Sequence, residues 1–143
     1  MNRAFQWMLK LVEMRRDRSV SQSRRAQQEF MRSREFTQQL QGYATEYDQQ
    51  WTQVAQRGDS ALMLHTTASF GDNLRSTAKA QAQETDKLQE HSQKMLQQAL
   101  KDARRVEALQ HYMARQQALR RAMAEKRDQK QLEDDLNARR SRS

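Results

Sequence analysis

The sequence of 143 residues contains no proline, no cysteine, three glycines and few aromatic residues: four Phe, three Tyr and two Trp. Sheets, sandwiches and barrels need turn residues at regular short intervals, and three glycines cannot supply them. Without cysteine the chain has no disulfide, no thiol nucleophile and no thiolate metal site. The composition therefore predicts a single all-α domain.

Long apolar runs are also missing. Hydrophobic residues make up 36% of the chain and charged residues 31%, a mixture that provides a seam between helices but no thick core. Gln6 and Lys10 interrupt the apolar stretch at the N-terminus, so it lacks the uninterrupted apolar region of a secretory signal, and nothing later resembles a membrane span. An organellar transit peptide is the alternative, but Glu13 and Asp17 argue against it. We expect a cytoplasmic protein without membrane insertion.

Two stretches carry apolar residues at alternate steps of four and three, the spacing that keeps them on one side of a coiled-coil helix. In the first, from Phe5 to Val54, ten of fifteen positions are apolar, and in the second, from Leu74 to Met123, nine of fifteen are. The pattern predicts a long antiparallel two-helix coiled coil, a helical hairpin. The exceptions in the first stretch are polar: Arg16, Ser19, Ser23, Ser33 and Thr37.

Helix-ending glycines lie between the two stretches. Gly58 and Gly71 are each followed by residues that favour a helix N-terminus, namely Asp59 and Ser60 after the first and Asp72 and Asn73 after the second. We expect one elongated domain over residues 1–143, with helix 1 over about 4–56, a turn or short helix over 57–73, helix 2 over about 74–137 and a frayed tail over 138–143.

A turn of this length sets the pairing of the helices. With residue 56 opposite residue 72, Tyr47 would face Gln81 and Phe5 would face Met123, and helix 2 would extend beyond helix 1 from about residue 128. Gly42 lies inside helix 1 at a cost of about 1 kcal/mol relative to alanine, which indicates either close backbone approach or a local bend.

The net charge of +8 is unevenly distributed. Residues 1–36 and 101–143 each carry five excess positive charges, whereas residues 37–100 carry two excess negative charges. A hairpin brings both basic segments to its open end, which favours an acidic partner, although arginine-rich helices also pair within themselves. Nucleic acid is not favoured, because no aromatic residues are interleaved with the arginines and no basic region adjoins a parallel zipper.

Motifs of catalysis are absent from the sequence. Three isolated glycines cannot form a phosphate-binding loop. The three histidines, His65, His91 and His111, are too dispersed for a metal site. A two-helix rod also offers no enclosed pocket for a general acid. We therefore expect no enzyme activity, no catalytic residue, no metal and no cofactor.

Aromatic residues gather near the expected turn. Leu40, Tyr43 and Tyr47 follow one stripe of helix 1, and Phe70 and Leu74 lie four residues apart beyond the turn. The hairpin brings both groups to the same end. They either widen the hydrophobic face there or form a patch that binds a partner.

With the stretch Glu125–Lys130, these residues give the chain a resemblance to the FliJ family, small coiled-coil stalk proteins of the bacterial flagellar type III export apparatus. The resemblance covers nearly the whole chain and implies a coiled coil similar to the gamma stalk of rotary ATP synthases. It implies three partners: the hexameric export ATPase, whose ring assembly such proteins promote; the cytoplasmic domain of the export gate protein FlhA; and export chaperones. It also implies a location at the inner-membrane base of the flagellum, peripheral to the membrane.

The resemblance further implies site residues. Leu40, Tyr43, Tyr47, Phe70 and Leu74 match the exposed gate-binding surface of the family. The sequence departs from the family at Phe36, where Gln is common, and at Thr77 and Gln81, where Ala and His are expected. Arginines of the basic end are the candidates for contact with the ATPase ring by charge complementarity: Arg15, Arg16, Arg18, Arg104, Arg120 and Arg121.

Three alternatives stay open. The stalk protein of an injectisome shares the architecture and charge but diverges at the tyrosine pair. A basic coiled coil that binds nucleic acid rests on the arginines alone. A structural coiled coil that self-associates would gain stability by bundling its thin seam.

Overall fold

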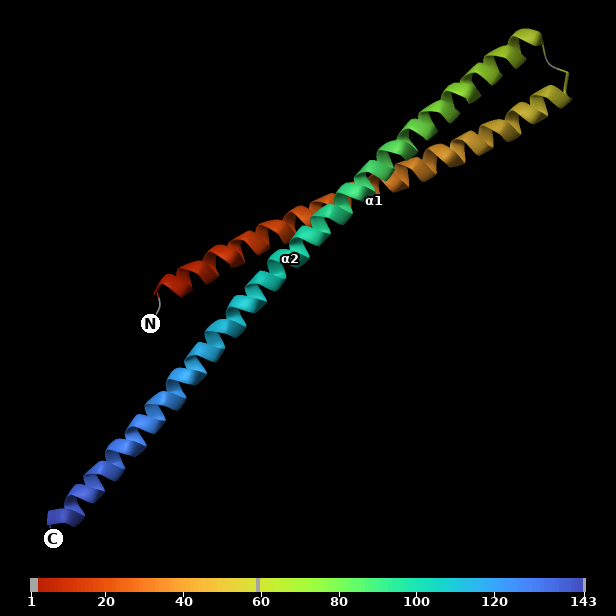
Figure 1. Cartoon of the computed structure of the whole chain (residues 1–143). Coiled ribbons are helices and arrows are strands. Elements are labelled where there is room, and N and C mark those ends of the chain that lie inside the picture. Colours follow the sequence, from red (N-terminus) through yellow and green to blue (C-terminus); the bar gives the residue numbers. More distant parts are fainter. Residues whose placement is uncertain (1–2, 59, 143) are drawn as a thin grey trace. The chain divides into compact units, whose positions relative to one another are not determined.

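The computed structural model describes residues 3–58 and 60–142. It contains two helices, α1 (Arg3–Gln56) and α2 (Ala61–Arg142), and no strand within these residues. The chain divides into two compact units, which we describe separately: unit 1 combines Met1–Arg16 with Lys101–Ser143, and unit 2 is Asp17–Leu100. In unit 2 the chain turns back on itself and the two helices pack antiparallel (Figure 1). The prediction of an all-α helical hairpin is confirmed.

Gly58 and Ser60 shape the link between the helices. Gly58 has a φ of 69°, the left-handed conformation that favours glycine at a helix C-terminus. Its amide donates to the Ala55 carbonyl at 3.3 Å. The Ser60 hydroxyl accepts the Met63 amide at 3.3 Å, as an N-cap side chain does. The predicted C-terminal cap at Gly58 and the predicted N-cap at Ser60 are therefore confirmed, while Asp59 lies outside the described residues.

The second expected cap, at Gly71, is not a helix end. α2 begins at Ala61 rather than near residue 74, passes through Gly71 and continues to Arg142 over the tail that was expected to fray. Gly71 is buried, and a Cβ added to it would lie 3.4 Å from Cδ1 of Tyr47. The small residue therefore lets the Tyr47 ring approach the α2 backbone. At Gly42 the expected close approach is wrong, because an added Cβ would meet no atom within 4 Å.

The earlier start of α2 changes the pairing of the helices. In unit 2 the Tyr47 ring packs on Phe70 instead of facing Gln81, a shift of eleven residues from 81 to 70. In unit 1 Phe5 packs on Tyr112 instead of Met123, again a shift of eleven, from 123 to 112. The expected pairing is therefore wrong. The unpaired part of α2 is correspondingly longer, since every residue from 117 to 142 is exposed.

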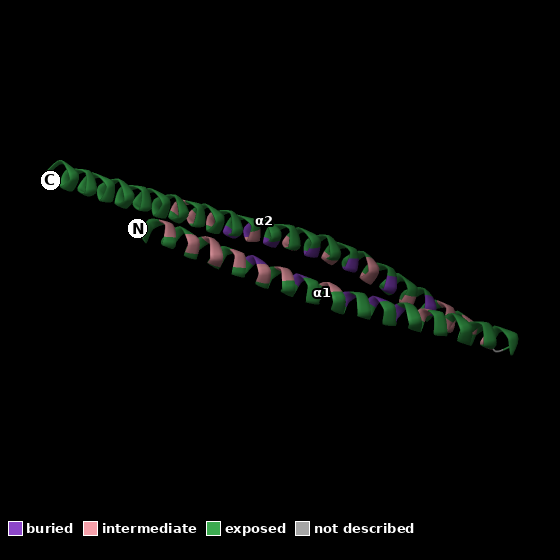
Figure 2. Cartoon of the chain, turned by 90° about the horizontal axis from the view of Figure 1, so that it is seen from below, coloured by how far each residue is buried: buried purple, intermediate pink, exposed green. Residues whose placement is uncertain are grey.

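The predicted seam positions are confirmed. In α1 every position of the pattern except Trp51 is buried or half-buried, and in α2 every position is except Arg120 and Met123. Figure 2 shows the buried residues as a line along each helix and the C-terminal part of α2 as exposed throughout. None of the described helical segments combines the length and the hydropathy of a membrane span.

Small and hydroxyl side chains, rather than large aliphatic ones, fill the centre of the seam in unit 2. Short side chains allow two helix backbones to approach closely, and their hydroxyl groups must then find partners within the seam. In the described chain every buried side-chain nitrogen and oxygen has a hydrogen-bond partner. The buried seam residues of unit 2 are Ser19, Ala26, Ser33, Thr37, Leu40, Ala78, Thr85, Ser92 and Ala99.

Thr85 is the centre of a hydrogen-bond network between α1 and α2. Its hydroxyl donates to the Gln81 carbonyl at 2.9 Å. Because that bond uses its only proton, Thr85 must accept the hydroxyls of Ser33 at 2.6 Å and Thr37 at 2.8 Å. Ser33 in turn accepts the Gln81 side-chain amide at 3.0 Å. The hydroxyls of Ser33 and Thr37 thus reach their acceptor on Thr85 only when α1 and α2 keep this pairing.

Thr85→Val should lower the free energy of unfolding by about 1–3 kcal/mol, because Ser33 and Thr37 lose the acceptor that they share while they remain buried. Urea denaturation, monitored by circular dichroism, measures this change. Thr77→Val is the matched control, since its exposed hydroxyl bonds only to the Asn73 carbonyl of its own helix. A combined Ser33→Ala, Thr37→Val and Thr85→Val variant should recover most of the loss. Equal effects of Thr85→Val and Thr77→Val would contradict the network.

Candidate functional site

An open groove of about 230 Å³ lies on unit 2 near the link between the helices. α1 contributes Tyr43, Glu46, Tyr47 and Gln50 to its lining, at spacings of three, four and seven residues that place them on one face of the helix. α2 contributes Phe70 and Leu74. The groove therefore joins one stripe from each helix.

Two aromatic rings that line the groove pack against each other. The rings of Tyr47 and Phe70 have centroids 4.7 Å apart and are tilted by 44°, an arrangement favoured by ring electrostatics. Tyr43 and Phe70 remain 56% and 52% exposed. Large aromatic side chains held on a rigid helical base are typical anchors of protein–protein interfaces. The polar groups of Glu46 and Gln50 border them.

The structure brings together four of the five residues expected to form a partner-binding surface: Tyr43, Tyr47, Phe70 and Leu74. Leu40 differs, because it occupies a seam position and is buried, so its expected exposure is wrong. Glu46 and Gln50 were missed as lining residues. Their spacing of three residues from Tyr43 and Tyr47 was the available signal.

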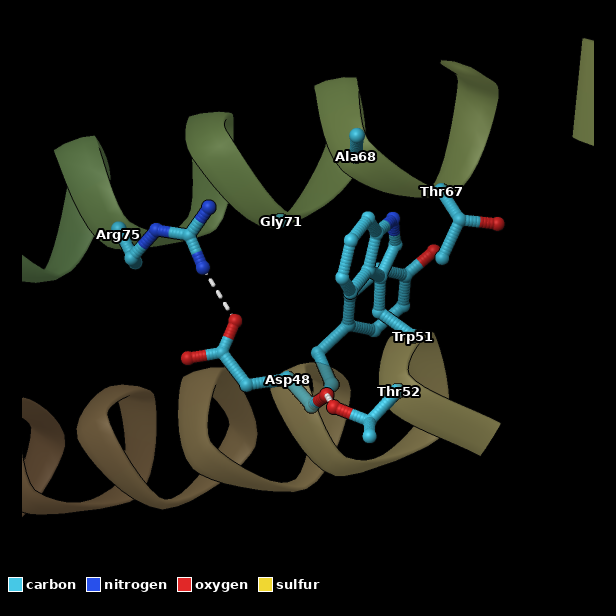
Figure 3. Close-up of a pocket in the computed structure, with 8 residues that line it drawn as sticks. Asp48, Trp51, Thr52, Thr67, Ala68, Gly71 and Arg75 are labelled. Atoms are coloured by element: carbon cyan, nitrogen blue, oxygen red, sulfur yellow. Dashed lines mark hydrogen bonds and ion pairs between the residues drawn. The ribbon is translucent and has the colours of Figure 1, made fainter. Parts of the chain in front are cut away.

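A second pocket, of about 350 Å³, shares Tyr47 with the groove and is also lined by Asp48, Trp51, Gly71 and Arg75 (Figure 3). Trp51 projects from α1 toward Thr67 and Ala68 of α2 and covers part of it. Trp51 remains 39% exposed although it occupies a position of the seam pattern. Tyr47 is half-buried and contributes to the lining of both pockets.

Arg75 of α2 forms an ion pair with α1 beside the second pocket. Its guanidinium pairs with Asp48 of α1 and with Asp72 of its own helix. The hydrogen bond to Asp72, together with the charge of Asp48, raises the pKa of Arg75 above its ordinary value. Because all three side chains are exposed, salt screens the pairing.

The predicted ATPase-contact arginines differ in their exposure. Arg16 occupies a seam position and is half-buried, and the other five are exposed. Arg18 belongs to unit 2 and the remainder to unit 1. The exposed arginines of unit 1 are Arg15, Arg104, Arg120 and Arg121.

The distribution of charge follows the two units. Unit 1 has sixteen basic and eight acidic residues, whereas unit 2 has ten of each. The whole net charge of +8 therefore belongs to unit 1, and the groove lies on a unit that is electrically neutral. In residues 3–58 and 60–142, no group of three or more His, Asp or Glu side chains could hold a metal ion. The two units thus differ in character, with an aromatic groove on unit 2 and an excess of positive charge on unit 1.

Comparison with protein families gives a match to a family model described as "Flagellar FliJ protein", over residues 1–143. Comparison with curated proteins and with solved structures finds no match.

The space in front of Gly71 should limit which side chains can replace it. Gly42→Ala should raise the free energy of unfolding by about 0.5–1 kcal/mol, because it improves helix propensity in open space. Gly71→Ala should gain less, since its Cβ would lie in contact with Tyr47. Gly71→Leu should lose about 1–3 kcal/mol, because its branched end would displace the Tyr47 ring. Thermal unfolding of the three variants measures these differences, and a Gly71→Leu variant as stable as Gly42→Ala would contradict the contact.

Proposed function

We propose that this chain acts as a stalk between the export ATPase and the export gate. The chain belongs to the FliJ family and is therefore a component of the flagellar export apparatus. Proteins of this family are structural components of the apparatus, and the function proposed here is binding rather than catalysis. In this proposal unit 2 binds the cytoplasmic domain of FlhA, and unit 1 binds the hexameric ATPase and promotes assembly of its ring. Export chaperones are a third class of partner.

The aromatic groove is the observation that supports gate binding. Tyr43, Tyr47, Phe70 and Leu74 come from distant parts of the sequence and line the same groove. Two of them remain exposed although their apolar area favours burial. A partner that covers Tyr43 and Phe70 gains this area without any rearrangement of Tyr47, which already packs on Phe70.

Charge supports the assignment of the ATPase to unit 1. A cationic surface raises the rate of association with an acidic surface and orients the encounter. Arg120 and Arg121 lie in the exposed stretch of α2 over residues 117–142, where no packing inside the unit restricts their side chains. They can therefore adapt to the rim or pore of a ring. The match to a flagellar family favours this role over the corresponding role in an injectisome.

Tyr43→Ala should weaken binding to the FlhA cytoplasmic domain by about thirtyfold, as expected for an aromatic anchor at an interface. It should leave helicity unchanged, because Tyr43 is exposed. Phe36→Ala is the matched control, since Phe36 is also an exposed aromatic residue of α1 but does not line the groove. Isothermal titration calorimetry and circular dichroism give the two readouts. Similar affinity losses for both variants would contradict the groove as the binding site.

Titration of the chain into export ATPase from the same organism should stimulate ATP hydrolysis and ring formation. A hydrolysis assay measures the first effect, and light scattering measures the second. Reversal of Arg120 and Arg121 to Glu should raise the half-saturating concentration by about tenfold or more, because two attractive contacts become repulsive. Reversal of Arg24 and Arg25 is the matched control, an exposed arginine pair on the neutral unit. Absence of any binding in low salt would overturn the stalk proposal, and equal effects of both reversals would overturn the assignment to unit 1.

A further inference from the structure

The α1 residues of unit 1 carry two apolar faces. Phe5, Leu9 and Val12 belong to the seam and are half-buried, with the Phe5 ring 5.6 Å from that of Tyr112. A second line consists of Trp7, Leu11 and Met14, which follow one another at steps of four and three. These three are 67%, 55% and 67% exposed. Since each helical residue turns by about 100°, this second line lies roughly opposite the seam.

Basic side chains border the second line on both edges. On a helical projection Lys10 and Arg3 lie along one edge and Arg15 along the other, and all three are exposed. Within residues 3–16 the single acidic residue is Glu13, which is half-buried and lies on the side toward the seam. The exposed face is therefore an apolar stripe between two cationic edges.

We propose that this face, Trp7, Leu11 and Met14 with Lys10 and Arg15, docks on a lipid bilayer that contains anionic lipids. An interfacial helix buries a stripe of Trp and Leu at the boundary of headgroups and acyl chains and keeps Lys and Arg at its edges. The long basic side chains reach up to the phosphates while their stems cover apolar surface. Indole rings favour this depth. The helix lies on the membrane and does not cross it.

The net charge of unit 1 favours an anionic bilayer over a second copy of the chain as the partner that covers this face. Unit 1 carries eight excess positive charges, so two copies that paired through this face would bring like charges together at Lys10 and Arg15. An anionic bilayer instead gains from each basic residue near its surface. The proposal does not depend on binding to the ATPase or the gate, because it concerns the chain alone with lipid.

The test uses the fluorescence of Trp7. The chain has two Trp residues, so in a Trp51→Phe variant Trp7 is the only indole. Vesicles of phosphatidylcholine with phosphatidylglycerol should shift its emission to shorter wavelength and carry the protein into the pellet on sedimentation. Vesicles of phosphatidylcholine alone should do so far more weakly, and added salt should weaken the binding to the anionic vesicles.

Leu11→Ser with Met14→Ser should lower the partition coefficient for anionic vesicles by about tenfold or more, because two apolar side chains no longer enter the bilayer. Leu132→Ser with Leu136→Ser is the matched control, a pair of exposed apolar residues on α2, and should bind as the unchanged chain does. Because all four residues are exposed, circular dichroism should show unchanged helicity for both variants.

Four results would overturn the proposal. They are the absence of vesicle binding, equal binding to both kinds of vesicle, binding to anionic vesicles that the Leu11 and Met14 substitutions leave intact, and a concentration-dependent emission shift without vesicles. The third result would indicate attraction by the basic surface alone, and the fourth would indicate that a second copy of the chain covers the face.

Discussion

The pairing between α1 and α2 in unit 2 depends on where α2 begins. Gly58 ends α1 in a left-handed conformation, and Ser60 caps α2 immediately afterward, so the link cannot take up a change in register. This short link places Tyr47 against Phe70. A later start of α2 would have placed Tyr47 against polar residues and separated the aromatic stripes. The aromatic groove is therefore a consequence of two helix caps that lie outside it.

Hydrogen bonds between hydroxyl groups in the seam favour this one pairing over others. Leucine-rich seams tolerate sliding, because one methyl group can replace another at similar cost. Hydroxyl groups do not, since a shift by one turn would take Ser33 and Thr37 away from the Thr85 hydroxyl that accepts from both. A seam of small polar residues thus exchanges some hydrophobic stabilisation for a defined register. That exchange suits a chain whose groove requires side chains from both helices.

The sequence predicts the seam positions of each helix better than it predicts how the two helices pair. Seam positions follow from the geometry of a single helix, so the steps of four and three identified nearly all of them. Whether Gly71 ends a helix or admits a neighbouring ring depends on Tyr47, which is distant in the sequence and reaches it only after the helices pair. Local rules favour the cap there, and the resulting error in the start of α2 shifted the pairing by eleven residues. The groove residues could still be grouped, because aromatic stripes on either side of a turn converge over a range of registers. The steps of four and three also place Leu40 in the seam, so its burial follows from the pattern of a single helix.

The aromatic groove and the net positive charge lie on different units, which gives them different responses to ionic strength. The groove is on a neutral unit and relies on aromatic area, whose free energy of burial depends little on moderate salt. The cationic surface belongs to the other unit, where attraction to an acidic partner weakens as the Debye length falls from about 10 Å at 0.1 M to about 3 Å at 1 M salt. In the proposed stalk role this division would be useful, because steering by charge affects mainly association and aromatic anchoring mainly dissociation. The two contacts can therefore be adjusted separately, although one pair of helices carries both.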